Sequence, residues 1–219
     1  MEQIPFSVSA RTAKLIGQEN FANADGAIIE LVKNSYDADS NVCVVVFDKK
    51  ESSIIIIDNG TGMTDEDIIN HWMIIGTNDK EENFQSLNGR VKTGAKGIGR
   101  FAMNRLGLVS ELRTISREKK KGHYWRVNWS DFDLKGANIS QVKADFDLLN
   151  EFSLNTYLSS RFSELDGLMN VFERYNFDYG TIIEITQLND NWDYKSIKKL
   201  FDNLEILIPP IEQPVFEIN

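Results

Sequence analysis

The spacing of apolar residues divides the beginning of the chain into helical and extended segments. Residues 9–40 place apolar side chains three and four positions apart, with a break at residues 24–26, which predicts two consecutive helices. Asp25 is expected to cap the second helix. Two β-branched runs follow, "NVCVVVFD" and "SSIIIID", and the polar residues between them predict a β-hairpin.

The same signals continue along the rest of the chain. Thr64 is expected to cap a short helix, and "IGRFAMNRLG" predicts a helix that ends at Gly107. "LVSELRTISRE" and "GHYWRVNWSDF" predict paired strands, "GTIIEITQL" a late strand, and "YKSIKKLFDNLEILI" a helix ended by Pro209 and Pro210. Helices and strands without strict βαβ alternation predict an α+β fold, a two-layer sandwich of helices on one mixed, mostly antiparallel sheet.

Length and charge narrow the class of protein. A chain of 219 residues is long enough for one well-buried domain, and 42% hydrophobic with 26% charged residues is an ordinary globular composition. The net charge of −9 argues against non-specific nucleic-acid binding, which needs clustered Lys and Arg. We interpret the basic run at residues 117–121 as a solvated hairpin turn instead of a nucleic-acid patch.

Cysteine and histidine usage bears on the cellular setting. Cys43 has no partner for an internal disulfide, and two histidines, His71 and His123, argue against a zinc site. The N-terminus lacks a signal-like apolar core, and no run approaches the roughly 20 apolar residues of a membrane span. We therefore expect a soluble, cytoplasmic protein without membrane contact.

Polar residues share one face of the second predicted helix. Glu30, Asn34 and Asp37 have i, i+4, i+7 spacing and fall within an arc of roughly 60°. Small and apolar residues fill the adjoining arc, so this face is expected to border a cleft. A semi-buried acid and amide are costly unless they hold a ligand, a metal or an ordered water. The alternative, a surface contact of Glu30 with Lys33 or Asn34, stays open from this helix alone.

A glycine-rich turn follows the second predicted strand. In "IIIIDNGTGM", Asp58 ends a β-branched run and is followed by Gly60 and Gly62. Glycine at both positions lets the backbone turn sharply and approach a flat ligand. A strand-end aspartate at such a turn can accept a hydrogen bond from an exocyclic purine amine. A simple Asp-Asn-Gly turn is the alternative.

A second glycine-rich segment leads into a helix. The polar residues 76–96, which show no clear periodicity, predict a long functional loop. "GRVKTGAK" lacks the P-loop lysine, and "GIGRFA" follows a polar loop instead of a strand, so neither a P-loop nor a Rossmann site is predicted. A phosphate could instead meet the helix start through the backbone of Gly97, Ile98 and Gly99 and the charges of Lys96 and Arg100.

The order of these motifs resembles the GHKL ATPase superfamily of gyrase B, heat-shock chaperones, histidine kinases and MutL. "ELVKNSYDA" is similar to its N-box, "DNGTGM" to the first glycine box, and "GAKGIGR" to the second. "GTIIEI" is similar to the late strand, with Thr181 as its threonine. The resemblance covers roughly residues 10–188, is closest to bacterial heat-shock-chaperone-like ATPase domains, and implies the Bergerat ATP-binding fold.

The resemblance also implies ligands and roles. ATP or ADP would bind with Mg²⁺, which Asn34 would ligate, and Glu30 would orient and deprotonate the attacking water. Asp58 would read the adenine amino group, supported by Thr181 and Asp37. The other implied nucleotide contacts are Gly60, Gly62, Met63, Thr77, Lys80, Gly94, Lys96, Gly97, Ile98, Gly99 and Arg100.

The implied organisation is one ATP-binding domain spanning residues 1–219, as the N-terminal part of a longer protein. It would comprise an N-terminal arm at 1–10, an ATP lid at about 74–97 and a family-variable insertion at about 131–178. Gyrase and MutL relatives take a catalytic lysine from a following domain, so we expect slow hydrolysis by a nucleotide-gated switch or dimer clamp, with the arm exchanged between copies. The alternatives are a nucleotide-binding module without turnover and a histidine-kinase-like phosphotransfer domain, although no histidine precedes Glu30.

Overall fold

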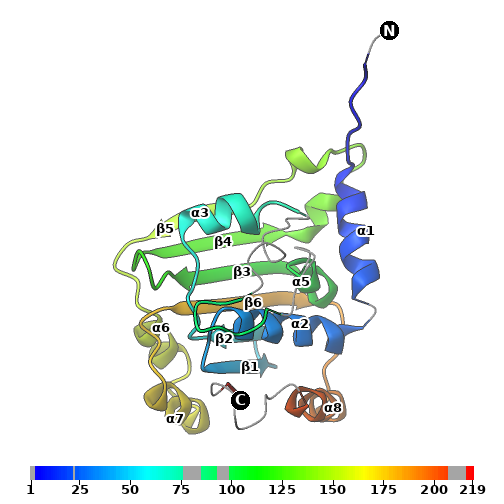
Figure 1. Cartoon of the computed structure of the whole chain (residues 1–219). Coiled ribbons are helices and arrows are strands. Elements are labelled where there is room, and N and C mark those ends of the chain that lie inside the picture. The colour runs from blue at the N-terminus through cyan, green and yellow to red at the C-terminus, as the bar shows by residue number, and fades with distance from the viewer. Residues whose placement is uncertain (1–2, 22, 76–84, 93–98, 207–215) are drawn as a thin grey trace.

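One seven-stranded mixed sheet organises the part of the chain that the computed structural model describes, residues 3–21, 23–75, 85–92, 99–206 and 216–219. The strand order is β5-β4-β3-β6-β2-β1-β7, and every neighbouring pair is antiparallel except the parallel pair β1 and β7. The predicted α+β fold with a mostly antiparallel sheet is confirmed (Figure 1). The strands are β1 Val42–Asp48, β2 Ser53–Asp58, β3 Gly107–Ile115, β4 Gly122–Asn128, β5 Asp145–Leu149, β6 Gly180–Leu188 and β7 Glu217–Ile218.

Strand β2 shows why its sequence is an unbroken apolar run. It pairs with β1 on one side and β6 on the other, and all its residues are buried. Ile54 and Ile56 belong to the core beneath the helices, whereas Ile55 and Ile57 belong to a second core on the opposite face. A strand covered on both faces needs apolar residues at every position instead of at alternate ones.

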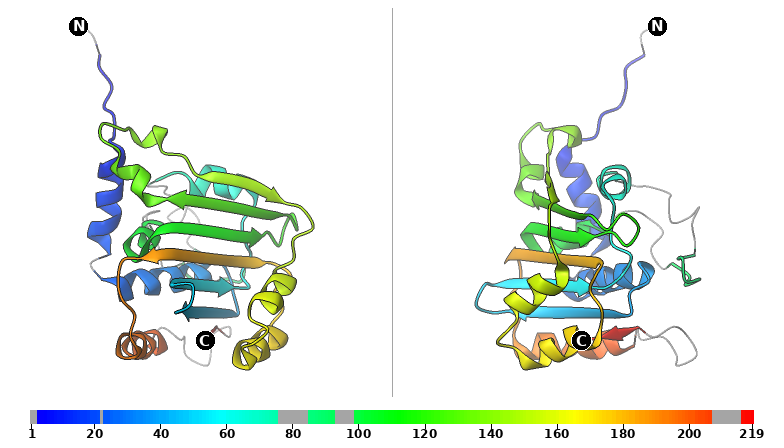
Figure 2. Two further views of the ribbon diagram at one scale, coloured as in Figure 1. Left: turned by 180° about the vertical axis from the view of Figure 1, so that it is seen from behind. Right: turned by 90° about the vertical axis from the view of Figure 1, so that its left-hand side faces the viewer.

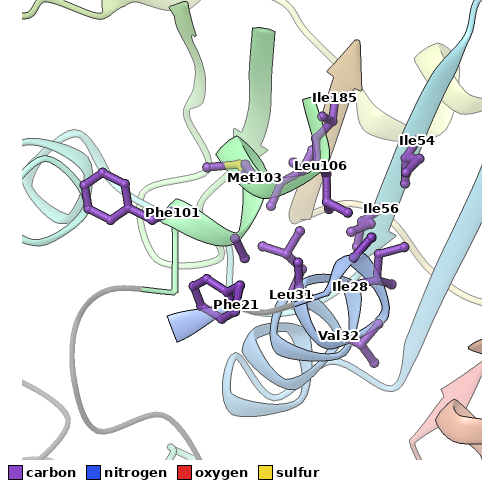
Figure 3. Packing of buried hydrophobic residues seen from close by; sticks show 14 of the residues in the cluster. Phe21, Ile28, Leu31, Val32, Ile54, Ile56, Phe101, Met103, Leu106 and Ile185 are labelled. Atoms are coloured by element: carbon purple, nitrogen blue, oxygen red, sulfur yellow. The ribbon is translucent and has the colours of Figure 1, made fainter. Parts of the chain in front are cut away.

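A helical layer covers one face of the sheet (Figures 1 and 2). Ile28 and Leu31 of helix α2 pack with Ile56 and Leu106 in the core between the helices and the sheet (Figure 3). No helix among the described residues is long and apolar enough to cross a membrane. The layer comprises α1 Ala10–Asn20, α2 Ala24–Asp37, α3 Asp65–Asp67, the π-helix η1 Ile68–Trp72 and α5 Phe101–Leu106.

Helices α6 and α7 cover part of the opposite face of the sheet. They form a partial third layer in addition to the two layers expected. Leu158 and Phe172 pack there with Val44, Ile57 and Ile182. These helices lie in the predicted insertion of residues 131–178, whose status as an insertion stays a prediction. The elements of this region are η2 Trp129–Asp133, η3 Ile139–Gln141, β5, α6 Leu154–Arg161 and α7 Asp166–Arg174.

The structure confirms two expected helix caps and the expected place of the basic run. Thr64 caps α3 in a capping box with Asp67, and Gly107 is the C-cap of α5. The basic run 117–121 lies in the connection between β3 and β4, as interpreted. The last helix, α8, spans Tyr194–Glu205, and the two prolines expected to end it lie outside the described residues.

The N-terminal cap of α2 corrects one expectation. Asn23, not Asp25, is the cap: its backbone is extended, and its side-chain oxygen accepts a hydrogen bond from the Gly26 N–H at 2.7 Å. The reason is that α2 begins two residues earlier than expected, which places Asp25 in the first turn. There its carboxylate pairs with Lys199 of α8.

Asn23→Ala is therefore expected to lower the free energy of unfolding by about 1 kcal/mol, because one N–H at the helix start loses its partner. Urea denaturation measures the change. Asp25→Asn is the matched control: it removes only a charge and an exposed ion pair, and should cost about 0.5 kcal/mol or less. A larger loss for Asp25→Asn than for Asn23→Ala would contradict this assignment of the cap.

Candidate functional site

Helix α2 meets the end of the second glycine box at Gly99. Glu30 and Asn34 are half-buried on α2, one turn apart, as the predicted cleft-bordering face requires. A Cβ atom added at Gly99 would lie 3.1 Å from Asn34 Nδ2 and 3.5 Å from Glu30 Oε1. Only a residue without a side chain leaves the space beside this acid and amide open. The fold thus brings together two motifs that are far apart in the sequence.

Asp58 lies buried at the end of β2 with a fixed orientation. One carboxylate oxygen accepts a hydrogen bond from the Gly60 N–H at 2.9 Å, and the other accepts one from the Ser35 hydroxyl at 3.1 Å. Burial raises the pKa of Asp58 to about 6, against the lowering effect of these bonds and one from the Thr181 backbone. A buried, oriented carboxylate suits recognition of one hydrogen-bond donor.

Ser35 is a site residue that the sequence reasoning missed. It follows Asn34 on α2, and its hydroxyl both donates to Asp58 and lies 3.6 Å from the Cys43 sulfur, which donates to it. Burial raises the pKa of the Cys43 thiol to about 12, so this group stays neutral behind the carboxylate. The available signal was a hydroxyl on the otherwise apolar face of the helix, where a buried polar group requires a partner.

Thr114 is a second missed residue, and it joins strands β3 and β6 to the turn after β2 at the predicted base pocket. Its hydroxyl accepts a hydrogen bond from the Met63 N–H at 3.0 Å and donates to the Gly180 carbonyl at 2.9 Å. It also lies 3.1 Å from the hydroxyl of Thr181, which is paired in register with Asp58. Thr114 is on the same face of β3 as Ser110 and Leu112, and all three residues are buried.

Two glycines of the first box permit close packing of the turn at residues 58–63. Gly62 has a positive φ of 62°, and a Cβ there would lie 2.0 Å from the Ile115 carbonyl oxygen. At Gly60 a Cβ would lie 2.7 Å from the Ala38 carbonyl oxygen, at the end of α2. Any side chain at either position would push the turn away from its neighbours. The predicted need for glycine here has this steric basis.

Arg100 and Asp37 complete the described part of the candidate set. The Arg100 guanidinium donates a hydrogen bond to the His71 carbonyl at 3.0 Å and lies over the Trp72 ring. Arg100 and Trp125 both line an apolar cavity. Burial lowers the pKa of Arg100 to about 10. Its charge therefore lies against η1, whereas the adjacent Gly99 lies at Asn34. Asp37 is buried at the last residue of α2. The predicted residues outside the described ranges are Thr77, Lys80, Gly94, Lys96, Gly97 and Ile98.

Known proteins resemble this chain over the region that carries the site. The profile of a family described as "Histidine kinase-, DNA gyrase B-, and HSP90-like ATPase" matches residues 22–156. A "Putative type II restriction enzyme HgiDII" from Herpetosiphon aurantiacus is 30% identical over 206 residues, which is 84% of this chain and 32% of that protein.

Bacterial chaperones match over shorter stretches. "Chaperone protein HtpG" from Campylobacter jejuni is 25% identical over 121 residues, 52% of this chain and 20% of that protein. HtpG from Buchnera aphidicola is 34% identical over 93 residues, 39% of this chain and 15% of that protein. The chain spans about a third or less of the length of these relatives. Because the family profile covers well over half of the chain and includes Glu30, Asn34, Asp58 and Gly99, the chain belongs to the histidine kinase, gyrase B and HSP90-like ATPase family.

Proposed function

We propose that this chain binds ATP together with Mg²⁺, hydrolyses it slowly, and changes conformation with nucleotide occupancy. The observation that carries the proposal is the double contact of α2. Its Ser35 donates to the buried Asp58 carboxylate, while Glu30 and Asn34 lie against Gly99. One rigid helix thereby fixes the distance between a site for a base and a site for phosphates.

The base end is proposed to recognise adenine. The bonds from Gly60 and Ser35 hold the plane of the Asp58 carboxylate, so that it can accept a hydrogen bond from an exocyclic amino group. Guanine presents a carbonyl oxygen where adenine presents that amine, and two acceptors would then face each other. Gly62 and Met63 would line the base, with Thr181 and Asp37 supporting this end.

The phosphate end is proposed to use the other turn of α2. Asn34 would hold Mg²⁺ through its side-chain amide oxygen, because a hard cation prefers oxygen ligands. Bound Mg²⁺ would neutralise charge on the phosphates. Glu30 would orient the attacking water and accept its proton. The backbone N–H of Arg100, whose side chain lies against η1, remains a proposed phosphate contact. The others are Thr77, Lys80, Gly94, Lys96, Gly97 and Ile98.

The proposal extends to assembly. Residues 3–7 extend away from the body of the protein (Figure 1), and the apolar side chains of Ile4 and Phe6 are exposed. We propose that this arm, residues 1–10, is covered by a second copy when nucleotide closes a dimer. The relatives are longer than this chain, so a following domain is proposed to supply a lysine and to set the biological task.

Calorimetry with purified protein tests the binding proposal. ATP and ADP should bind, chelation of Mg²⁺ should weaken ATP binding, and GTP should bind at least about tenfold more weakly because of the acceptor at its base. Equal affinities for ATP and GTP would contradict the role of Asp58. Phosphate release measured alongside decides turnover: binding without release favours a nucleotide-binding module, and label transfer to a histidine favours phosphotransfer.

A further inference from the structure

Residues 85–92 form a hairpin that is fixed to the end of helix α2 (Figure 2). The hairpin is closed by the Ser86 N–H donating to the Arg90 carbonyl at 2.8 Å. Asp39, just after α2, accepts hydrogen bonds from the Ser86 hydroxyl at 2.5 Å and from the Asn88 N–H at 3.1 Å. Asp39 has a positive φ of 61°, a conformation that few residues with side chains adopt. Its two bonds to the hairpin offset the cost of that backbone.

Arg90 fastens the hairpin from its other side. Its guanidinium is buried and donates to the Tyr36 carbonyl at 3.1 Å and to the Ser40 carbonyl at 2.7 Å. It also lies 4.6 Å from the centroid of the Tyr36 ring. A cation at carbonyls of a helix C-terminus is favoured by both hydrogen bonding and the helix dipole.

The same arginine contacts Phe216, the residue just before strand β7. Its guanidinium lies 5.9 Å from the centroid of the Phe216 ring, and Phe216 packs edge-on against Tyr36 at 5.4 Å. Residues 216–219 are held in turn by β1, since Glu217 N–H donates to Asn41 and Asn219 N–H donates to Cys43. Arg90 thus sits between the hairpin, the end of α2 and β7.

The end of α2 is also the support of the base pocket. The Thr61 N–H donates to the Ala38 carbonyl at 2.8 Å, which fixes the turn after Asp58. The Ser40 hydroxyl donates to the Ser35 carbonyl at 2.6 Å, and Ser35 holds Asp58. Tyr36 and Ser40, whose carbonyls Arg90 binds, flank this support.

We infer that Arg90 is a positioning residue that couples the base end of the nucleotide site to the C-terminal strand β7. A ligand that stabilises the turn at residues 58–63 also stabilises the backbone that Arg90 binds, and hence the packing of Phe216. Coupling of this kind is reciprocal, so ordering of β7 favours the ligand equally. The identity of the ligand as an adenine nucleotide rests on the proposed function. The connection from the hairpin to β7 does not depend on it.

Amide hydrogen exchange on the whole chain tests the connection with and without ATP. In the ligand-free protein, Arg90→Met should speed exchange at Glu217 and Asn219 about tenfold, with Arg90→Lys in between. In the wild type, ATP should slow hydrogen exchange at the Glu217 and Asn219 amides about tenfold. In Arg90→Met, saturating ATP should leave exchange at these amides unchanged. Arg126→Met is the matched control, because that arginine pairs with Glu111 and Asp145 on the far side of the sheet and should change neither result.

Exchange at β7 that is the same in Arg90→Met and wild type would overturn the inference. Phe216→Leu approaches the same connection from its other end, and should speed exchange at Asn88 and weaken ATP binding about fivefold. An unchanged Asn88 in that variant counts against the coupling even if Arg90→Met does not fold. A wild type that binds no ATP refutes the proposed function, while the ligand-free exchange rates still decide whether Arg90 connects hairpin and strand.

Discussion

Replacing Asp58 by asparagine is expected to weaken ATP binding by about 100-fold while making the free protein more stable at neutral pH. A hydrogen bond to a charged acceptor contributes about 1.5–3 kcal/mol, which corresponds to roughly tenfold to 100-fold in affinity. Asparagine can still accept from the Gly60 N–H, as Asp58 does now. Its amide nitrogen would then face the adenine amine, donor against donor, so the upper end of that range is expected.

The gain in stability follows from the burial of the Asp58 charge. Its pKa in the folded protein is raised to about 6, above that of an exposed aspartate, so folding favours the protonated form. The stability that Asp58 contributes is then full below its unfolded pKa and is lost as pH rises through about 6. At pH 7.5 the ionised group costs up to about 3 kcal/mol, which an uncharged asparagine removes. A rise in melting temperature of a few degrees is expected.

The pH dependence of binding gives an independent readout of the same carboxylate. ATP affinity of the wild type should fall as pH drops from 7.5 to 5, with a midpoint near the Asp58 pKa of about 6, because the protonated acid turns one acceptor into a donor. Asp58→Asn should bind weakly at every pH and show no such midpoint. Calorimetry between pH 5 and 8 with parallel thermal unfolding measures both effects.

Asp48→Asn is the matched control for these measurements. Asp48 also ends a strand of the same hairpin, but its carboxylate accepts from the Lys50 and Glu51 N–H groups in an exposed turn. Affinity for ATP should not change in this variant, and stability should fall slightly. If Asp58→Asn binds ATP as tightly as Asp48→Asn does, Asp58 does not read the base.

The parts of the site that were predictable from the sequence depend on local periodicity. The spacing of Glu30 and Asn34 required one helical face, and the run ending at Asp58 required a buried strand. The hydrogen-bond partners of these residues were not predictable in the same way. Ser35 contacts Asp58, and Thr114 contacts Met63, only because the fold packs segments together that are distant in the sequence. The cap of α2 was missed for a smaller reason, since Asn23 and Asp25 both favour that role and differ only in where the helix begins.

The predicted lid at residues 74–97 illustrates what periodicity leaves out. Within it, residues 76–96 have no repeating apolar pattern and were expected to form one long loop. The described residues 85–92 are instead a hairpin, closed by Gly89 in a left-handed conformation and bound to Asp39 and Arg90. These contacts join residues about 50 positions apart, so no window of local sequence could have indicated them.

Glu30→Gln is expected to lower ATP hydrolysis at least about 100-fold while leaving ATP affinity within about twofold of the wild type. A general base contributes typically 10²–10⁴ to a rate, and glutamine keeps the size of the side chain but cannot take the proton. The space beside Gly99 would stay the same, because the replaced atom occupies the position of a carboxylate oxygen. Single-turnover phosphate release with saturating ATP separates the chemical step from binding.

The two outcomes for Glu30 distinguish catalysis from a structural role of the same face. If the Glu30 carboxylate only shapes the site, Glu30→Gln should weaken ATP binding and lower protein stability, and hydrolysis should fall only as far as binding does. If Glu30 is the general base, the variant should lose hydrolysis rate alone. Glu19→Gln on α1, an exposed position, controls for a general effect of removing one acid and should release phosphate at the wild-type rate. Unchanged hydrolysis in Glu30→Gln would remove Glu30 from the chemistry and return it to the surface role that its helix alone allowed.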